Sequence, residues 1–252
     1  MIKSLVKSAL GRVGLKLERI APKKAGHLFD EDGLRTDHNH DFIREPRFLK
    51  AYQAGVATGD QYPGRWRFHV ALWAAQHAAK LVGDFVECGV NTGSLSVACL
   101  NYVDWSSLGK TLHLFDTWEG FDRNLVSARE AELGVFKIYD GWYNSESYER
   151  AKSNFARFPR VNFYRGSVPS TLSMATIEQI SYLSIDMNCM APEIAAAEYF
   201  WDKIVSGGMI LLDDYGWNGP HIVQKEAFDK FAADRDTQVL SLPTGQGLIV
   251  KR

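Results

Sequence analysis

The stretch DFVECGVNTG, residues 84–93, decides the fold class of this chain. Its first half is typical of a buried strand that ends near Glu87, and its second half is a turn that contains Gly89 and Gly93. Apolar residues recur at helical spacing directly afterwards, in SLSVACLNYV (residues 94–103). A strand, a glycine turn and a helix in this order begin a parallel α/β sheet, in which ligands bind at the carboxyl ends of the strands. The ligand at this turn must therefore tolerate an acidic neighbour.

Strands and helices alternate along the rest of the chain. Short apolar runs that end in polar or acidic residues are separated by segments with helical spacing. These runs are FVEC (85–88), TLHLFD (111–116), VNFYRG (161–166), YLSID (182–186) and MILLDD (209–214). Two further strands flank the short connection TGQG (244–247), so they must be antiparallel neighbours. The sequence therefore predicts an α/β fold: a Rossmann-like, doubly wound sheet that is mostly parallel, with one reversed C-terminal strand.

An N-terminal helical extension precedes this sheet, and we expect residues 1–80 to form an arm and a helical cap. Helical patterns cover residues 44–55 and 63–83, where Leu72 and Trp73 are expected in the core, while residues 30–41 are expected to form a polar loop. Residues 1–24 are basic, with Glu18 as the single acid. This arm could form an amphipathic helix that contacts an anionic membrane surface, or it could pack on this subunit or a partner. Residues 81–252 are expected to form the ligand-binding domain.

Composition narrows the class of ligand. With 29 basic and 30 acidic residues the formal net charge is -1, so no strong global field points to nucleic acid. The 3 cysteines form no closely spaced pair, which favours buried thiols in a reducing cytoplasm over disulfides or a zinc site. We therefore expect a cytoplasmic protein, with contact at the inner membrane face as an alternative for the basic arm, that binds a small molecule and assembles as a homo-oligomer.

The glycine turn favours S-adenosylmethionine over a dinucleotide. A dinucleotide turn has the pattern GxGxxG, but Asn91 stands where the middle glycine would be. The carboxylate of Glu87 would repel a pyrophosphate, whereas it would attract a ligand with ammonium and sulfonium centres. Asp116 ends the next strand, at the place of an acid that accepts hydrogen bonds from ribose hydroxyls.

A cluster of acids predicts a metal site. Asp186 ends one strand, and Asp213 and Asp214 end another strand of the same sheet, so their carboxylates can converge. A hard divalent cation with oxygen ligands, such as Mg²⁺, would relieve their mutual repulsion. The alternative is that one or more of these acids caps a helix or binds the cofactor.

Several motifs in this order resemble the macrocin O-methyltransferase family. They are GDFVECGVNTG (83–93), FDTWEGF (115–121), FYRGSVPSTL (163–172), SID (184–186) and LLDDY (211–215). The resemblance implies a class I, metal-dependent enzyme that methylates sugar hydroxyls on natural products. It implies a cofactor site made of Glu87, Gly89, Val90, Asn91, Thr92, Gly93, Ser94, Asp116, Thr117, Trp118, Gly166, Ser167 and Asp186. It also implies that Asp186, Asp213 and Asp214 hold the metal. The stretch DMNCMAPE (186–193) departs from the family's usual Asp-Gly-Asp-Leu-Tyr, which leaves the acceptor open.

The expected reaction moves a methyl group to a hydroxyl of a sugar-containing acceptor. A metal that chelates two neighbouring hydroxyls would orient the attacking oxygen and lower its pKa. Asp186 is the candidate base, and His221 is a second candidate for which the simpler interpretation is a surface residue in the first turn of a helix. Residues 122–147 interrupt the alternation of strands and helices and could form a lid. The alternatives are a catechol or phenol acceptor, an NAD-dependent oxidoreductase, and a binding protein without catalysis.

Overall fold

The computed structural model describes residues 28–59, 64–139 and 146–252. The chain divides into two compact units, Met1–His40 and Asp41–Arg252. The basic arm of residues 1–24 lies outside the described residues, so its proposed helix stays a prediction. No helix in the described ranges is long and apolar enough to cross a membrane. Cys88, Cys99 and Cys189 are free and buried, as the sequence predicts.

The first unit contains a small hairpin of β1 (Phe29–Glu31) and β2 (Leu34–Thr36). The prediction of a polar loop is therefore wrong for residues 30–36, whereas residues 37–40 carry no helix or strand. Asp32 and Gly33, both at positive φ, form a two-residue turn of the kind that joins hairpin strands. His40 is buried and packs edge-on against Phe29, with the ring centroids 5.7 Å apart.

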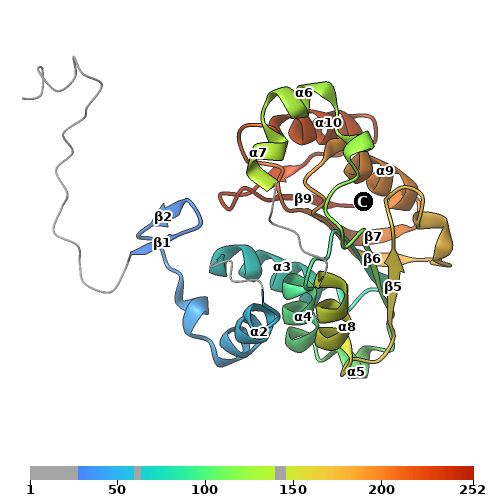
Figure 1. Cartoon of the computed structure of the whole chain (residues 1–252). Helices are drawn as coiled ribbons and strands as arrows, with labels where there is room; N and C mark the ends of the chain where they lie inside the picture. The colour runs from blue at the N-terminus through green and yellow to red at the C-terminus, as the bar shows by residue number, and fades with distance from the viewer. Residues whose placement is uncertain (1–27, 60–63, 140–145) are drawn as a thin grey trace, which may run out of the picture. The chain divides into compact units, whose positions relative to one another are not determined.

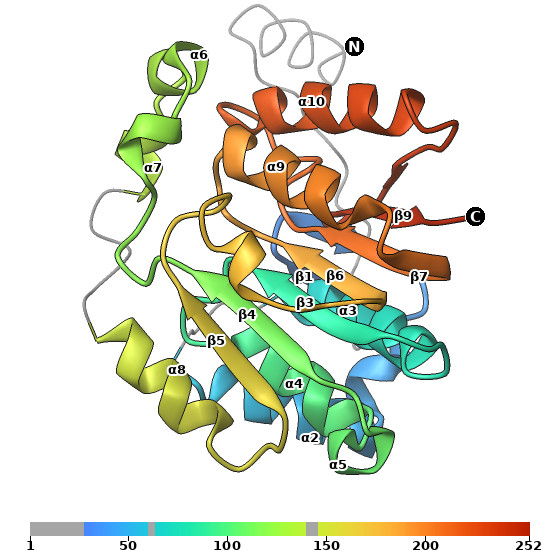
Figure 2. The ribbon, with the colours of Figure 1, turned by 90° about the vertical axis from the view of Figure 1, so that its right-hand side faces the viewer.

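The second unit is built on a seven-stranded sheet with the order β5-β4-β3-β6-β7-β9-β8 (Figures 1 and 2). The strands are β3 (Asp84–Cys88), β4 (Leu112–Asp116), β5 (Val161–Arg165), β6 (Ile180–Ile185), β7 (Ile204–Leu212), β8 (Leu240–Ser241) and β9 (Gly247–Val250). Strands β3 to β7 pair in parallel, and β9 is antiparallel to both β7 and β8. The prediction of a mostly parallel sheet with a reversed C-terminal strand is confirmed.

Helices cover both faces of this sheet (Figure 2). One face packs against α2 (Pro46–Val56), α3 (Arg65–Ala78), α4 (Ser94–Tyr102), α5 (Trp105–Leu108) and α8 (Ser147–Phe155). The other packs against α9 (Met190–Trp201) and α10 (His221–Ala233). Strand residues alternate between the two cores: Tyr182 faces the first core, and Leu183 faces the second. A central strand therefore buries both faces, as a doubly wound sheet requires.

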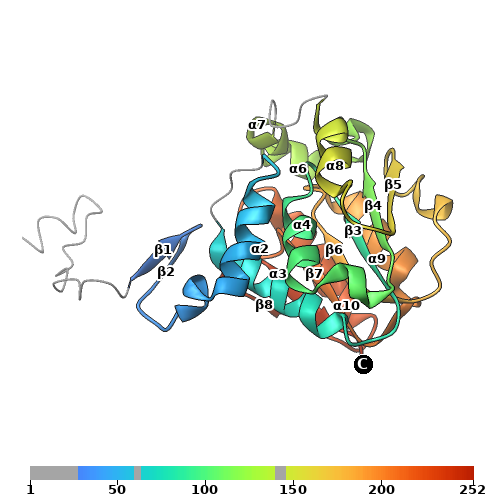
Figure 3. The ribbon, with the colours of Figure 1, turned by 90° about the horizontal axis from the view of Figure 1, so that it is seen from below.

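The helical cap is part of the unit that carries the sheet. Helix α2 lies beside α4, and α3 contacts α4 and β7 (Figure 3). The second compact unit begins at Asp41 and so includes the helices of the cap together with the sheet. The predicted domain boundary after residue 80 stays a prediction. Trp73 was expected in the core, but its side chain is 53% exposed. Its neighbours Ala71, Leu72 and Ala74 take the buried positions, which leaves Trp73 on the outer face of α3.

Between β4 and the crossover helix α8 the chain carries additional short helices. These are η2 (Arg123–Leu125), α6 (Ala128–Glu132) and α7 (Val135–Tyr139), whereas η1 (Asp41–Arg44) and η3 (Leu172–Met174) lie elsewhere in the chain. Ser127 begins α6 with a capping box, in which its hydroxyl and the Glu130 side chain satisfy backbone N–H groups at the helix start. Residues 140–145 of the expected lid lie outside the described residues.

Candidate functional site

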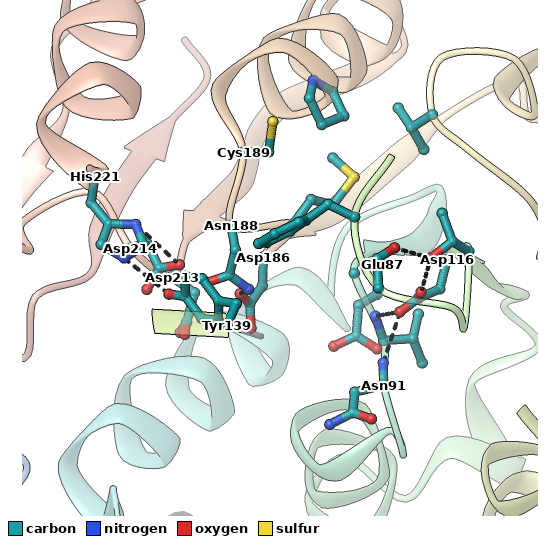
Figure 4. Close-up of a pocket in the computed structure, with 18 of the residues that line it drawn as sticks. Glu87, Asn91, Asp116, Tyr139, Asp186, Asn188, Cys189, Asp213, Asp214 and His221 are labelled. Carbon is teal, nitrogen blue, oxygen red and sulfur yellow. Dashed lines mark hydrogen bonds and ion pairs between the residues drawn. The ribbon is translucent and has the colours of Figure 1, made fainter. Parts of the chain in front are cut away.

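The carboxyl ends of β3, β4, β6 and β7 surround a cavity of about 490 Å³ (Figure 4). The backbone brings these ends together: the N–H of Asp186 donates to Cys88, and the N–H of Gly89 donates to Phe115, each at 2.8 Å. Gly89 has a φ of +89°, and a Cβ atom there would lie 1.7 Å from the carbonyl oxygen of Asp186. A glycine is therefore required where β3 passes closest to the end of β6.

The carboxylate of Asp116 ties two turns together. It accepts hydrogen bonds from the backbone N–H groups of Val90 at 2.6 Å, Asn91 at 2.8 Å and Trp118 at 2.6 Å. Because an ionised carboxylate offers about four acceptor positions, these bonds leave little of its capacity for a ligand. Asp116 still lines the cavity, so its contact with ribose stays a prediction.

Glu87 is a buried carboxyl group on the wall of the cavity. Its Oε2 atom accepts no hydrogen bond from any described residue. Burial, together with the charges of Asp116 and Asp213, raises the pKa of Glu87 to about 8. A ligand cation at this place would supply the missing partner and favour the ionised carboxylate.

The three predicted metal ligands converge. Asp186, Asp213 and Asp214 each offer a carboxylate oxygen, and these oxygens lie within 4.8 Å of one another. Burial and the two neighbouring carboxylates raise the pKa of Asp186 well above its usual range. Such a cluster of hard oxygen donors is suited to Mg²⁺.

Arg67 on α3 holds one member of this cluster, and the sequence analysis missed it. Its guanidinium forms a buried ion pair with the carboxylate of Asp213 and donates to the Asp213 carbonyl at 3.1 Å. Gln246, the residue before β9, donates to the other carboxylate oxygen of Asp213 at 3.0 Å. The sequence does indicate that Arg67 is buried, because it lies at helical spacing from Ala71, Ala74 and Ala78 on the buried face of α3.

His221 is buried at the start of α10, so the interpretation as a surface residue is wrong. Its Nε2 atom lies 2.9 Å from the hydroxyl of Tyr139 on α7, and its Nδ1 atom lies 2.6 Å from Oε1 of Gln224. Nδ1 also lies 3.7 Å from a carboxylate oxygen of Asp214. His221 therefore joins α7 to the acid cluster (Figure 4). The sequence analysis did not single out Tyr139 or Gln224.

Most of the predicted cofactor residues line the cavity. These are Glu87, Gly89, Val90, Asn91, Ser94, Asp116, Thr117, Gly166, Ser167 and Asp186. Thr92, Gly93 and Trp118 are not among the lining residues. The Thr92 hydroxyl bonds that of Thr58 at 3.0 Å, the Gly93 backbone packs against Phe155, and Trp118 is buried in the first core. Their contact with the cofactor stays a prediction.

The fold and the cavity define a class of protein: the Rossmann-like methyltransferases, in which the sheet ends in a reversed strand. The chain belongs to the macrocin-O-methyltransferase (TylF) family, whose pattern matches residues 66–239. It is therefore an S-adenosylmethionine-dependent O-methyltransferase. Among curated proteins, none matches this sequence.

Solved structures share the fold. The O-methyltransferase NovP has 20% identity and a TM-score of 0.63, and the match covers 73% of this chain and 79% of that one. The calicheamicin methyltransferase CalS11 has 14% identity and a TM-score of 0.55, over 84% and 97% of the chains. A putative caffeoyl-CoA O-methyltransferase from Staphylococcus aureus has 11% identity and a TM-score of 0.56, over 84% and 95%. At these identities the likeness concerns the fold.

Proposed function

We propose that this enzyme methylates a hydroxyl of a sugar or of a glycosylated natural product, with Mg²⁺ held at the acid cluster. The observation that carries the proposal is that the acid cluster and the buried Glu87 line one cavity. Glu87 would hold the cationic methionine end of S-adenosylmethionine, which directs the methyl group toward the acids. The sugar acceptor is supported by the family and by CalS11, described as a TDP-rhamnose 3'-O-methyltransferase.

The acid cluster fits a divalent cation in donor chemistry and in charge. All three side chains are carboxylates, and the guanidinium of Arg67 offsets one of their negative charges. A divalent cation would offset the other two. When bound, Mg²⁺ would orient neighbouring oxygens of the acceptor and lower the pKa of the attacked hydroxyl.

The residues of the chain perform the remaining steps. When bound, S-adenosylmethionine would supply the methyl group: the acceptor oxygen would gain the methyl carbon as the carbon–sulfur bond is lost, with S-adenosylhomocysteine as the second product. Asp186, whose carboxylate lies in the acid cluster on the wall of the cavity, would take the proton of the acceptor hydroxyl. Phe121 and Leu125 give the cavity apolar walls, which would limit the access of water to the reacting groups.

Activity with and without the metal tests this proposal. Methyl transfer to TDP-rhamnose and to catechol should be measured with Mg²⁺, with excess chelator, and after Mg²⁺ is restored. We expect transfer to the sugar that is lost with the chelator and recovered with Mg²⁺. Asp213→Asn should lose most turnover but keep its affinity for S-adenosylhomocysteine, since the predicted cofactor contacts lie mainly on earlier strands. Undiminished transfer in chelator would contradict the metal role, and transfer to catechol alone would identify the other acceptor class.

A further inference from the structure

The cofactor turn, residues 89–93, is held from two sides. On the side of β4, the Asp116 carboxylate accepts from the backbone N–H groups of Val90 and Asn91. On the other side, the turn contacts Asn154 and Phe155 of α8, which the sequence analysis did not single out. Helix α8 lies beside α4 (Figure 1), and none of its residues is among the described residues that line the cavity. It therefore contacts the turn from behind.

The side-chain amide of Asn154 joins the cofactor turn to the chain that follows α2. Its Nδ2 atom lies 2.9 Å from the carbonyl oxygen of Thr92 and 3.2 Å from that of Thr58. A backbone carbonyl oxygen can only accept, so the NH₂ group of Asn154 faces both oxygens and gives one N–H bond to each. The hydroxyls of Thr58 and Thr92 lie 3.0 Å apart and join the same two segments.

The next residue of α8 fills the space that Gly93 leaves. Gly93 precedes α4 with a φ of +88°, and a Cβ atom there would lie 2.2 Å from Cε2 of the buried Phe155 ring. The close approach of α8 therefore requires a glycine, in addition to the left-handed backbone. Tyr148, also on α8, packs against Trp118 with the ring centroids 4.9 Å apart. One helix thus contacts both turns of the cofactor site.

We propose that α8 sets the conformation of the cofactor turn and that Asn154 is the positioning residue through which it acts. The peptide group between Thr92 and Gly93 is planar, so a bond that fixes the Thr92 carbonyl also fixes the Gly93 N–H. That N–H donates to the carbonyl oxygen of Val90 at 2.8 Å and closes the turn. Val90 and Asn91 line the cavity, so Asn154 acts on the cofactor site without lining it. This inference concerns cofactor binding and depends on neither the acceptor nor the metal proposed above.

Calorimetry with S-adenosylhomocysteine tests the role of Asn154. Asn154→Asp keeps the size of the side chain but places a carboxylate against two carbonyl oxygens. We expect the affinity to fall by about tenfold or more, as for the loss of a partner at a buried polar group. Lys152→Ala is the matched control, because it removes only an exposed ion pair with Glu149 on the same helix, and it should keep the wild-type affinity.

Hydrogen exchange in the free protein separates positioning from a general loss of stability. In Asn154→Asp the amides of Val90, Asn91 and Gly93 should exchange faster than in the wild type, by a larger factor than the amides of the central strand β6. A general loss of stability would speed exchange in both places equally, because the amides of a core strand exchange mainly through global unfolding.

Three results would overturn the inference. They are a wild-type affinity in Asn154→Asp, an equal loss of affinity in Lys152→Ala, and an equal increase of exchange in β6 and in the cofactor turn. Should Asn154→Asp fail to fold, Asn154→Ala would be measured in the same way, since it removes the same two N–H donors without adding a charge.

Discussion

At the residue scale, the buried carboxyl of Glu87 is costly to ionise in the free protein, and the proposed function gives a reason for that cost. A carboxyl group with a raised pKa is less stable when ionised, and a binding site can hold such a group because the ligand later supplies the opposite charge. The unpartnered Oε2 atom of Glu87 is such a case. Arg67 is the opposite case, because it removes part of the repulsion at Asp213 before any ligand binds.

Glu87→Gln should change how stability depends on pH. The pKa of Glu87 is about 8 in the folded protein and near its ordinary value of 4.5 when unfolded, so the folded protein binds more protons between these values. Its contribution to the free energy of unfolding therefore falls as the pH rises from about 4.5 to about 8. Denaturant unfolding at pH 6 and pH 8.5 should show a smaller decrease for Glu87→Gln than for the wild type. The same decrease in both proteins would contradict the raised pKa.

At the element scale, a buried acid links α6 to α9. Glu130 is 1% exposed and accepts from the backbone N–H of Met190, the first residue of α9, at 2.7 Å. Its other oxygen accepts from the Ser127 hydroxyl at 2.6 Å. One side chain thus caps two helices, and it keeps the segment with Leu125 and Tyr139 at the wall of the cavity.

Glu130→Ala should loosen this segment. Loss of the carboxylate leaves buried N–H groups without a partner, which costs about 1–3 kcal/mol for each group. Hydrogen exchange in residues 122–139 should become faster than in the wild type, while exchange in β3 and β6 should change little. Arg129→Ala is the matched control, because its exposed ion pair with Glu226 contributes little. Equal exchange in the two variants would argue against the capping role.

At the scale of the whole molecule, the role of the basic N-terminal arm is a separate question from the chemistry of the cavity. Every described residue that lines the cavity lies at or after Arg67, in the second unit. We propose that this arm serves assembly of a homo-oligomer or contact with an anionic membrane.

A protein that begins at Ala25 tests this division. Its affinity for S-adenosylhomocysteine, measured by calorimetry, should equal that of the full chain, because every proposed cofactor contact is retained. A smaller mass in light scattering would identify assembly as the role of the arm, and weaker binding to phosphatidylserine vesicles would identify membrane contact. Loss of cofactor affinity would show that the arm contributes to the site.

The sequence by itself determined the sheet, its reversed strand, and the acids at the strand ends. Alternation and helical spacing arise from residues within a few positions of one another, and the ends of parallel strands meet at one edge wherever the chain leads. Glu87, Asp116 and Asp186 could therefore be assigned to one cavity without coordinates. A short turn likewise determined the antiparallel pairing of β8 and β9.

Only the tertiary structure decided which partners these acids have. Arg67 and Asp213 are 146 residues apart, and Tyr139 and His221 are 82 apart. No local pattern encodes such a pair, because it depends on how α3, α7 and α10 pack on the sheet. Burial of His221 was missed for the same reason: helical periodicity places a residue on a face, but the element that covers that face comes from a distant part of the chain.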